Sequence, residues 1–216
     1  MATSPPDPNP LDLHSVDALL STTRSVRRKL DFDRVVEPEL LYQCIDLATQ
    51  APMGIGGESW RFLIVTEPER KRAVADLYRD VIEGFEAAGR LQIKDTQRAL
   101  IARLPDMPAM IFVYINAPAP GAEVAAQVGF YGSILPVAWS LMLALRSRGL
   151  GTTWTSLLAS RQAELAQLLD APPDSTLTVM FPVAHMKGAV LKATSRQPAE
   201  AVTFWNSWGE AGPDVR

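Results

Sequence analysis

The chain has 216 residues, of which 47% are hydrophobic and 21% are charged, so it can build a buried core and is not a wholly disordered protein. Its 21 Lys and Arg residues against 24 Asp and Glu residues give a net charge of -3, which argues against a general nucleic-acid binder. One cysteine, Cys44, and two histidines, His14 and His185, exclude a disulfide framework and make a zinc site of His and Cys ligands a poor hypothesis, so we expect no metal.

The N-terminal segment predicts an extension to a single domain. Residues 1–10, MATSPPDPNP, have no positive charge and no apolar stretch, so we expect no secretory signal there and place the protein in the reducing cytoplasm. Residues 1–14 contain four prolines and predict a flexible arm. The rest, residues 15–216, shows no internal repeat and predicts one domain.

The first half of that domain alternates apolar periodicity with turn signals. In chain order it predicts a helix over 16–26, a loop over 30–37, a helix over 38–52, a glycine-rich loop over 53–58, a strand over 60–66, and helices over 69–88 and 90–103. Pro38 suits a helix start, and Gly89 suits a helix stop.

The second half is more apolar. It predicts a strand over 108–116, a long helix over 123–148 ended by Gly149, a strand over 152–156, a helix over 162–169, a strand over 176–183 and an aperiodic tail from His185. The sequence PAMIFVYIN at 108–116 is apolar throughout, which places that strand at the centre of its sheet. Because helices and strands mix without strict alternation, we expect an α+β fold.

Residues 124–145 contain no charged side chain and are long enough to cross a membrane. Four polar or helix-breaking residues interrupt the span, at Gln127, Ser133, Pro136 and Ser140, and no second window of this kind exists. A nearly all-apolar helix also suits the centre of a domain or an obligate dimer. We therefore expect a buried helix and no membrane partner, with a membrane span as the alternative.

The chemistry-bearing residues are few. No G-x-S-x-G, P-loop, H-E-x-x-H or G-x-G-x-x-G motif is present, and histidine is scarce, so a bound cofactor is the natural centre of any reaction. If the helix over 16–26 continues, Arg24 and Arg27 share a face and, with Ser25, converge on one anion; a solvated basic patch is the alternative.

Two glycine-bearing segments offer a second and a third candidate site. The loop APMGIGGE at 51–58 allows close backbone approach to a flat or phosphorylated ligand, with a structural turn as the alternative. The segment GLGTTWTS at 149–156 joins a helix stop to a small polar strand, and ordinary capping next to an edge strand explains it equally well.

Taken in order, these segments resemble the nitroreductase family of flavoproteins. The resemblance is carried by TTRSVRRKLDF at 22–32, LATQAPMGIGGESWRFLIVTEPERKRAV at 47–74, LMLALRSRGLGTTWTS at 141–156, FPVAHMKG at 181–188 and SRQPAEAV at 195–202. It implies a mostly antiparallel central sheet flanked by helices, and an intertwined homodimer that binds two FMN molecules at its interface. A C-terminal dimerisation arm bearing Trp205 and Trp208 fits this picture.

The resemblance also implies cofactor-binding residues. At the phosphate and ribityl chain it implies Arg24, Ser25, Arg27 and Arg196, along the isoalloxazine Pro52, Met53 and Gly54 with Glu58 close by, and at the flavin N5 and O4 edge the amides of Ser156 and Leu157. The sequence departs from the usual family residues at Thr23, Gly56 and Glu58, and at the pair Trp139 and Ser140 in the long helix. If the Glu58 carboxylate is ionised near the flavin, its charge lowers the flavin potential.

The activity implied is transfer of hydride from NAD(P)H through flavin N5 to a small-molecule acceptor such as a nitroaromatic or a quinone. No catalytic side chain is implied, because the flavin carries the chemistry. Two alternatives stay open: a specialised member resembling the flavin-fragmenting enzymes or the reductive dehalogenases, and a non-catalytic protein that binds or stores flavin.

Overall fold

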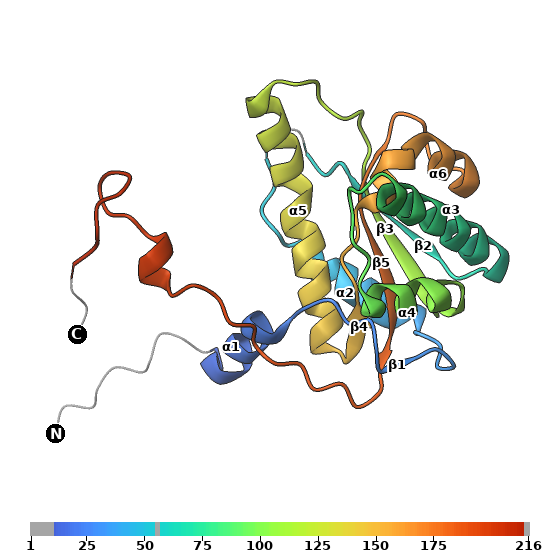
Figure 1. The fold of residues 1–216 in the computed structure, drawn as a ribbon, viewed down its shortest axis with the longest axis horizontal. Coiled ribbons are helices and arrows are strands. Elements are labelled where there is room, and N and C mark those ends of the chain that lie inside the picture. Colours follow the sequence, from blue (N-terminus) through green and yellow to red (C-terminus); the bar gives the residue numbers. More distant parts are fainter. Residues whose placement is uncertain (1–10, 55–56, 214–216) are drawn as a thin grey trace.

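The computed structural model describes residues 11–54 and 57–213. Its elements along the chain are α1 (Leu13–Thr22), β1 (Leu30–Asp31), α2 (Pro38–Ala48), β2 (Trp60–Val65), α3 (Pro68–Ala87), α4 (Asp95–Arg103), β3 (Ala109–Ile115), α5 (Val124–Ser147), β4 (Leu150–Thr152), α6 (Gln162–Leu169) and β5 (Thr176–Met186), with short 3-10 turns η1 (Leu104–Asp106), η2 (Leu157–Arg161) and η3 (Ala199–Val202). Figure 1 shows α5 on one side of the sheet and α3, α4 and α6 on the other.

The sheet is built around β5, and every strand pair in it is antiparallel. β3 pairs with both β5 and β2, whereas β4 and β1 pair with the C-terminal end of β5. His185 of β5 faces Leu150 of β4 and Asp31 of β1, so these two short strands lie on opposite edges of β5. The expected antiparallel sheet and the central place of β3 are confirmed.

The side chains of β3 alternate between two separate cores. Met110, Phe112 and Tyr114 join the cluster formed with α3, α4 and α6, while Ile111 and Val113 join the cluster formed with α2 and α5. All seven residues of β3 are buried, as expected for a strand covered by helices on both faces. The fold therefore has three layers: helix, sheet and helix.

Helix α5 is buried over only part of its length. Its buried residues, Ile134, Val137, Ala138, Leu141, Met142, Ala144 and Leu145, lie in its C-terminal two thirds. Val124 and Val128 near its start are 71% and 66% exposed. It is the one helix in the described part of the chain that is long and apolar enough to cross a membrane. Its packing on the sheet agrees with a core helix, and its start carries apolar surface that this chain leaves uncovered.

Several predicted boundaries differ from the structure. α1 starts at Leu13, within the stretch expected to be an arm, because Asp12 caps it by accepting a hydrogen bond from the His14 amide. α4 starts at Asp95 rather than at residue 90, and β5 continues to Met186. The predicted strand over 152–156 is replaced by β4 and an isolated bridge between Thr155 and Met180. β1 was expected to be loop.

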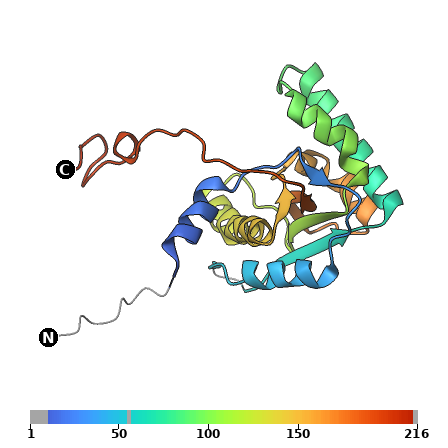
Figure 2. The ribbon, with the colours of Figure 1, turned by 90° about the horizontal axis from the view of Figure 1, so that it is seen from below.

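The chain leaves the body after β5. Residues 187–213 run past α1 and away from the sheet and its helices, as Figures 1 and 2 both show. The tail bears the exposed aromatic residues Phe204, Trp205 and Trp208, of which Trp208 is 92% exposed. Phe204 and Trp208 contact each other, with ring centroids 5.1 Å apart. Large apolar side chains held away from their own core indicate an interaction surface.

Candidate functional site

Residues 23–27, which follow α1, are neither helix nor strand, so the predicted helix over 16–26 is wrong at its C-terminal end. α1 stops at Thr22, and Thr23 has the extended angles φ -65° and ψ 126°. The hydroxyls of Ser21, Thr22 and Thr23 each donate to the carbonyl four residues earlier, a pattern that weakens helices. Arg24 and Arg27 therefore do not share a helix face, and their convergence must come from tertiary structure.

That tertiary structure is a pair of hydrogen bonds that joins this segment to β4. The Val26 amide donates to the Thr152 carbonyl at 2.8 Å, and the Thr153 hydroxyl donates to the Val26 carbonyl at 3.0 Å. Val26 and Thr153 are both buried. Two segments singled out separately in the sequence, 24–27 and 149–156, are thus held side by side through buried hydrogen bonds.

Next to this junction the surface is hollowed over about 700 Å³. The hollow is lined by α1, the segment after it, α5, Trp154 and the C-terminal tail; its lining residues are Leu20, Ser21, Thr23, Arg24, Ser25, Trp139, Met142, Trp154, Ala193, Thr194 and Arg196. Arg24 donates from Nη1 to the Lys192 carbonyl at 2.6 Å and from Nη2 to the Thr194 hydroxyl. These bonds bring the tail, and with it Arg196, to the predicted Arg24 and Ser25 pair.

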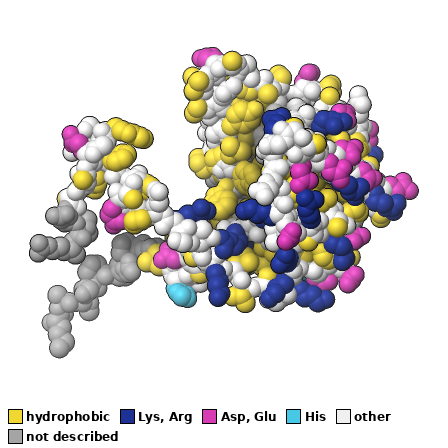
Figure 3. All heavy atoms as spheres, viewed as in Figure 1, with side chains coloured by type: hydrophobic (Ala, Val, Ile, Leu, Met, Phe, Trp, Pro, Cys, Tyr) yellow, Lys and Arg dark blue, Asp and Glu magenta, His cyan; other side chains and the backbone are white. Residues whose placement is uncertain are grey.

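The hollow carries uncompensated positive charge. None of its described lining residues is acidic, and within residues 11–54 and 57–213 the arginines at positions 24, 27, 28 and 196 form no ion pair with a carboxylate. Figure 3 shows Lys and Arg side chains gathered beside the lower end of the apolar strip formed by α5. Two arginines and a serine hydroxyl around one hollow suit a phosphate dianion.

The predicted flavin-edge residues, Ser156 and Leu157, come directly after this junction in the sequence. Thr155 is fixed to β5 by two backbone hydrogen bonds with Met180, of 3.2 Å and 2.8 Å. Ser156 and Leu157 come next and begin the short turn η2. Ser156 is exposed and Leu157 is half-buried. Neither residue lines the hollow, but both are joined to it through the segment 152–155.

The predicted loop residues Pro52, Met53 and Gly54 lie elsewhere. All three are exposed, and the Gly54 amide donates to the Ser133 hydroxyl of α5 at 3.2 Å. A Cβ on Gly54 would lie 2.8 Å from that hydroxyl, so only glycine fits here without a shift. None of the three lines the hollow, so this single chain does not bring the loop together with Arg24.

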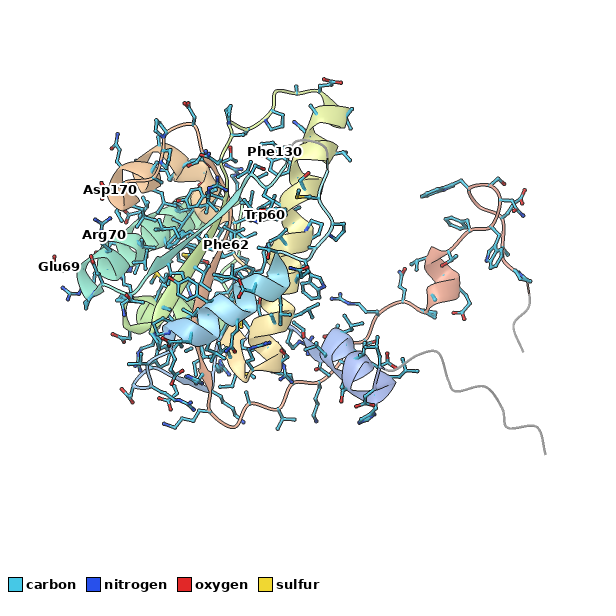
Figure 4. The ribbon with its side chains drawn as sticks, turned by 180° about the vertical axis from the view of Figure 1, so that it is seen from behind. Trp60, Phe62, Glu69, Arg70, Phe130 and Asp170 are labelled. Carbon is cyan, nitrogen blue, oxygen red and sulfur yellow. The ribbon has the colours of Figure 1, made fainter. Side chains whose placement is uncertain are left out.

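The side of the molecule that carries this loop is seen from behind in Figure 4, where Phe130 of α5 and Trp60 of β2 are labelled and α1 lies well away from both. Glu58, just before β2, is exposed. Its carbonyl accepts a hydrogen bond from Arg61 Nη1 at 3.1 Å. Glu58 does not line the hollow either, and Gly56 lies outside the described residues.

Three residues of this region were not among the predicted cofactor-binding residues. Trp139 and Trp154 line the hollow beside the arginines, and Trp154 stands edge-on to Phe181 with ring centroids 5.5 Å apart. Tyr78 of α3 places its hydroxyl 3.2 Å from Thr155 Oγ1. Trp154 lies inside the GLGTTWTS segment, whereas nothing in the sequence of α3 indicates that its tyrosine reaches Thr155, 77 residues away.

Known proteins are similar to this chain in sequence and in fold. The family model described as Nitroreductase family matches residues 20–185. Iodotyrosine deiodinase 1 of Rattus norvegicus is 25% identical over 193 residues, covering 85% of this chain and 67% of that protein. 5,6-Dimethylbenzimidazole synthase of Rhodospirillum rubrum is 30% identical over 170 residues, covering 74% of this chain and 76% of that protein.

Among solved structures, oxidized iodotyrosine deiodinase bound to FMN and 3-iodo-L-tyrosine matches with a TM-score of 0.67 at 21% identity. The match covers 89% of this chain and 100% of the other. The expected fold is thereby confirmed. The chain spans about two thirds of the length of the rat deiodinase.

Proposed function

Because the chain belongs to the nitroreductase family, we propose that it is an FMN-dependent oxidoreductase that takes hydride from NAD(P)H and passes it through flavin N5 to a conjugated acceptor such as a nitroaromatic or a quinone. The observation that carries this proposal is the hollow lined by Arg24, Ser25 and Arg196, which holds positive charge with no acidic side chain among its described lining residues. FMN, when bound, supplies the electron-transfer chemistry.

The residues of the hollow fit the phosphate end of FMN. Arg24 and Arg196 offer planar donor groups that match phosphate oxygens, and Ser25 adds a neutral donor. Arg27, one residue beyond Val26, continues the same segment toward Tyr78. The amides of Ser156 and Leu157 would lie at the N5 and O4 edge and stabilise charge that develops there. We therefore propose that the phosphate and the ring edge are held by one joined pair of segments.

We further propose that the site is completed by a second copy of the chain. Pro52, Met53 and Gly54 do not line the hollow of their own chain, and Gly54 bonds instead to Ser133 in the N-terminal half of α5. Val124, Val128, Leu135 and Trp139 leave apolar surface exposed along α5, as expected for a helix that packs against a partner. In a homodimer the loop of one copy would lie over the hollow of the other, and the tail of each copy would anchor on its partner.

A specialised activity is the second candidate, and the relatives favour it. Matching proteins include a deiodinase and a synthase of dimethylbenzimidazole. The sequence also holds Thr23 and Glu58 at positions where the resemblance implies other residues. In this second candidate the acceptor is a halogenated aromatic, or the flavin itself is consumed. The same FMN site serves both candidates, and they differ in the reaction that the reduced flavin undergoes.

The first experiment is an absorption spectrum of the purified protein, with chromatographic identification of the released chromophore. We expect FMN at about one per chain, bleached anaerobically by NADH or NADPH and reoxidised by a nitroaromatic or a quinone. Reoxidation only by a halogenated phenol, or loss of flavin with formation of a benzimidazole, supports the specialised candidate. Two results together indicate a storage protein. The flavin stays oxidised in the presence of NADH and of NADPH, and after reduction by dithionite no acceptor reoxidises it.

The matched test of the site replaces one arginine. Arg24→Met removes the charged guanidinium and keeps an unbranched apolar stem, and a charge-assisted contact to phosphate contributes about 1.5–3 kcal/mol. We expect FMN binding to weaken by about ten- to a hundredfold in a fluorescence titration. Arg79→Met is the control, because Arg79 pairs with Asp76 on the exposed face of α3. Equal affinity in both variants would contradict the phosphate assignment.

A further inference from the structure

Among the described residues, Tyr78 is one of two buried tyrosines in the hydrophobic cluster formed with α3, α4 and α6. It lies in the middle of α3, is 6% exposed, and packs among residues of the core formed by α3, α4 and α6. Its hydroxyl lies 3.2 Å from Oγ1 of Thr155, which is 8% exposed. Both hydroxyls are buried and form a hydrogen bond with each other, which offsets the free-energy cost of burying either one alone.

Thr155 is thereby held from two directions. Its amide and carbonyl bond to Met180 of β5, and its hydroxyl bonds to a helix on the covered face of the sheet. The preceding residue, Trp154, points to the opposite side, toward Phe181 in the other core. A short segment fixed by bonds on its backbone and on both of its faces has little freedom to move.

Burial keeps the Tyr78 hydroxyl in its neutral form. Burial raises the pKa of Tyr78, while the hydrogen bond with Thr155 and the positive charge of Arg27 act in the opposite direction. A neutral phenol can donate or accept a hydrogen bond, so it can pair with a threonine hydroxyl in either sense. Arg27 therefore lies near enough to act on the same hydroxyl that reaches Thr155.

We infer that Tyr78 is a positioning residue of the flavin site: its hydroxyl fixes Thr155 and so aims the adjacent amides of Ser156 and Leu157 at the N5 and O4 edge of the flavin. The inference rests on the proposed function. It extends the site to α3, a helix that contributes no residue to the hollow. It also explains why a hydroxyl is present at this place, where a phenyl ring would fill the same core space.

The test uses Tyr78→Phe and Thr155→Val, which remove one hydroxyl each and preserve shape, together with the double variant. Amides that drift from the flavin edge stabilise the electron-rich reduced form less well. We expect both single variants to lower the flavin midpoint potential and to slow flavin reduction by NAD(P)H about three- to tenfold, the size of one hydrogen bond. Because the two groups form one bond, the double variant should be no worse than either single one.

The control is Tyr114→Phe. Tyr114 lies in the same core, is 4% exposed, and its hydroxyl has no hydrogen-bond partner among the described residues. Removing that hydroxyl should leave the potential, the visible spectrum and the rate of reduction as in the wild type. The FMN dissociation constant and the melting temperature are measured for every variant, since a purely structural role lowers the melting temperature alone.

An unchanged midpoint potential and reduction rate in Tyr78→Phe would overturn the inference, and so would effects of Tyr78→Phe and Thr155→Val that add in the double variant. Failure of the proposed function gives a different result, because the wild-type protein would then either not bind FMN or hold a flavin that NADH and NADPH do not reduce. If wild type binds FMN and Tyr78→Phe does not, Tyr78→Leu shows whether misfolding causes the loss of FMN binding. A folded Tyr78→Leu protein that binds FMN as the wild type does would also refute the inference.

Discussion

Deletion of residues 201–216 tests the proposal that the tail anchors one copy of the chain on another. The deletion removes Phe204, Trp205 and Trp208 and leaves Arg196 in place. In the single chain the rings of Phe204 and Trp208 contact each other, and the tail that carries all three aromatic residues stands away from the body. If they pack against a partner, the shortened protein should form a weaker dimer while each copy keeps its two cores.

The structure sets the size of the effect. Phe204, Trp205 and Trp208 are 42%, 51% and 92% exposed, and an aromatic residue buries about 150–250 Å² when covered. Covering the exposed parts of all three removes roughly 400 Å² from water, or about 10 kcal/mol at about 25 cal/mol per Å² as an upper bound. If about a quarter survives the cost of ordering the tail, the dimer dissociation constant rises about a hundredfold.

Sedimentation velocity over a range of protein concentrations measures this change. The control is Val190→Ser, which alters an apolar residue that is 78% exposed on the tail but lies before the aromatic group. The control should dimerise as the wild type does. A deletion variant that remains as tight a dimer as the wild type refutes the anchoring role, and a wild-type protein that is monomeric at every concentration refutes the dimer itself.

Two further predictions concern the flavin potential and the packing of β4. Glu58→Gln should raise the midpoint potential if the carboxylate lies near the flavin in the dimer, and potentiometry showing an equal or lower value would contradict this. Gly151→Ala should destabilise the protein by about 1–3 kcal/mol in urea denaturation, because its Cβ would lie 2.7 Å from a side-chain carbon of Leu30. Gly84→Ala is the control: a Cβ there meets nothing within 4 Å, so stability should rise by about 0.5–1 kcal/mol. Equal stabilities of the wild type and Gly151→Ala would show that β1 can move away from the added methyl group.

The sheet and most helices were predictable because their signals are local. The apolar run at 108–116 contains β3 with an error of one residue at each end, since burial on both faces demands apolar residues throughout. Gly89 and Gly149 follow the ends of α3 and α5 with positive φ values of 66° and 76°, where glycine costs least. Such residues depend on the conformation of their own backbone, so the local sequence is enough to predict them.

The site was only partly predictable because its geometry is not local. The periodicity of 16–26 favours a helix through Val26, yet the Val26 amide bonds to Thr152 instead. Arg196 reaches the hollow because Arg24 holds the tail through Lys192 and Thr194, which lie 168 and 170 residues along the chain. No pattern in either segment encodes that contact, and the resemblance to a family supplied it.

The separation of Gly54 from Arg24 leads to a test of how the site is shared. If the loop of one copy completes the hollow of the other, Arg24→Met and Gly54→Val each damage both sites of a homodimer. A mixed dimer of these two variants then holds one site with both residues intact and one with neither. Since about half of the dimers in an equimolar mixture are mixed, mixing restores about a quarter of the FMN sites. If each chain builds its own site, every site in the mixture carries one defect and nothing is restored. The two variants are unfolded together and refolded together, and a titration with FMN then distinguishes the two arrangements. The control is Arg24→Met protein unfolded and refolded alone.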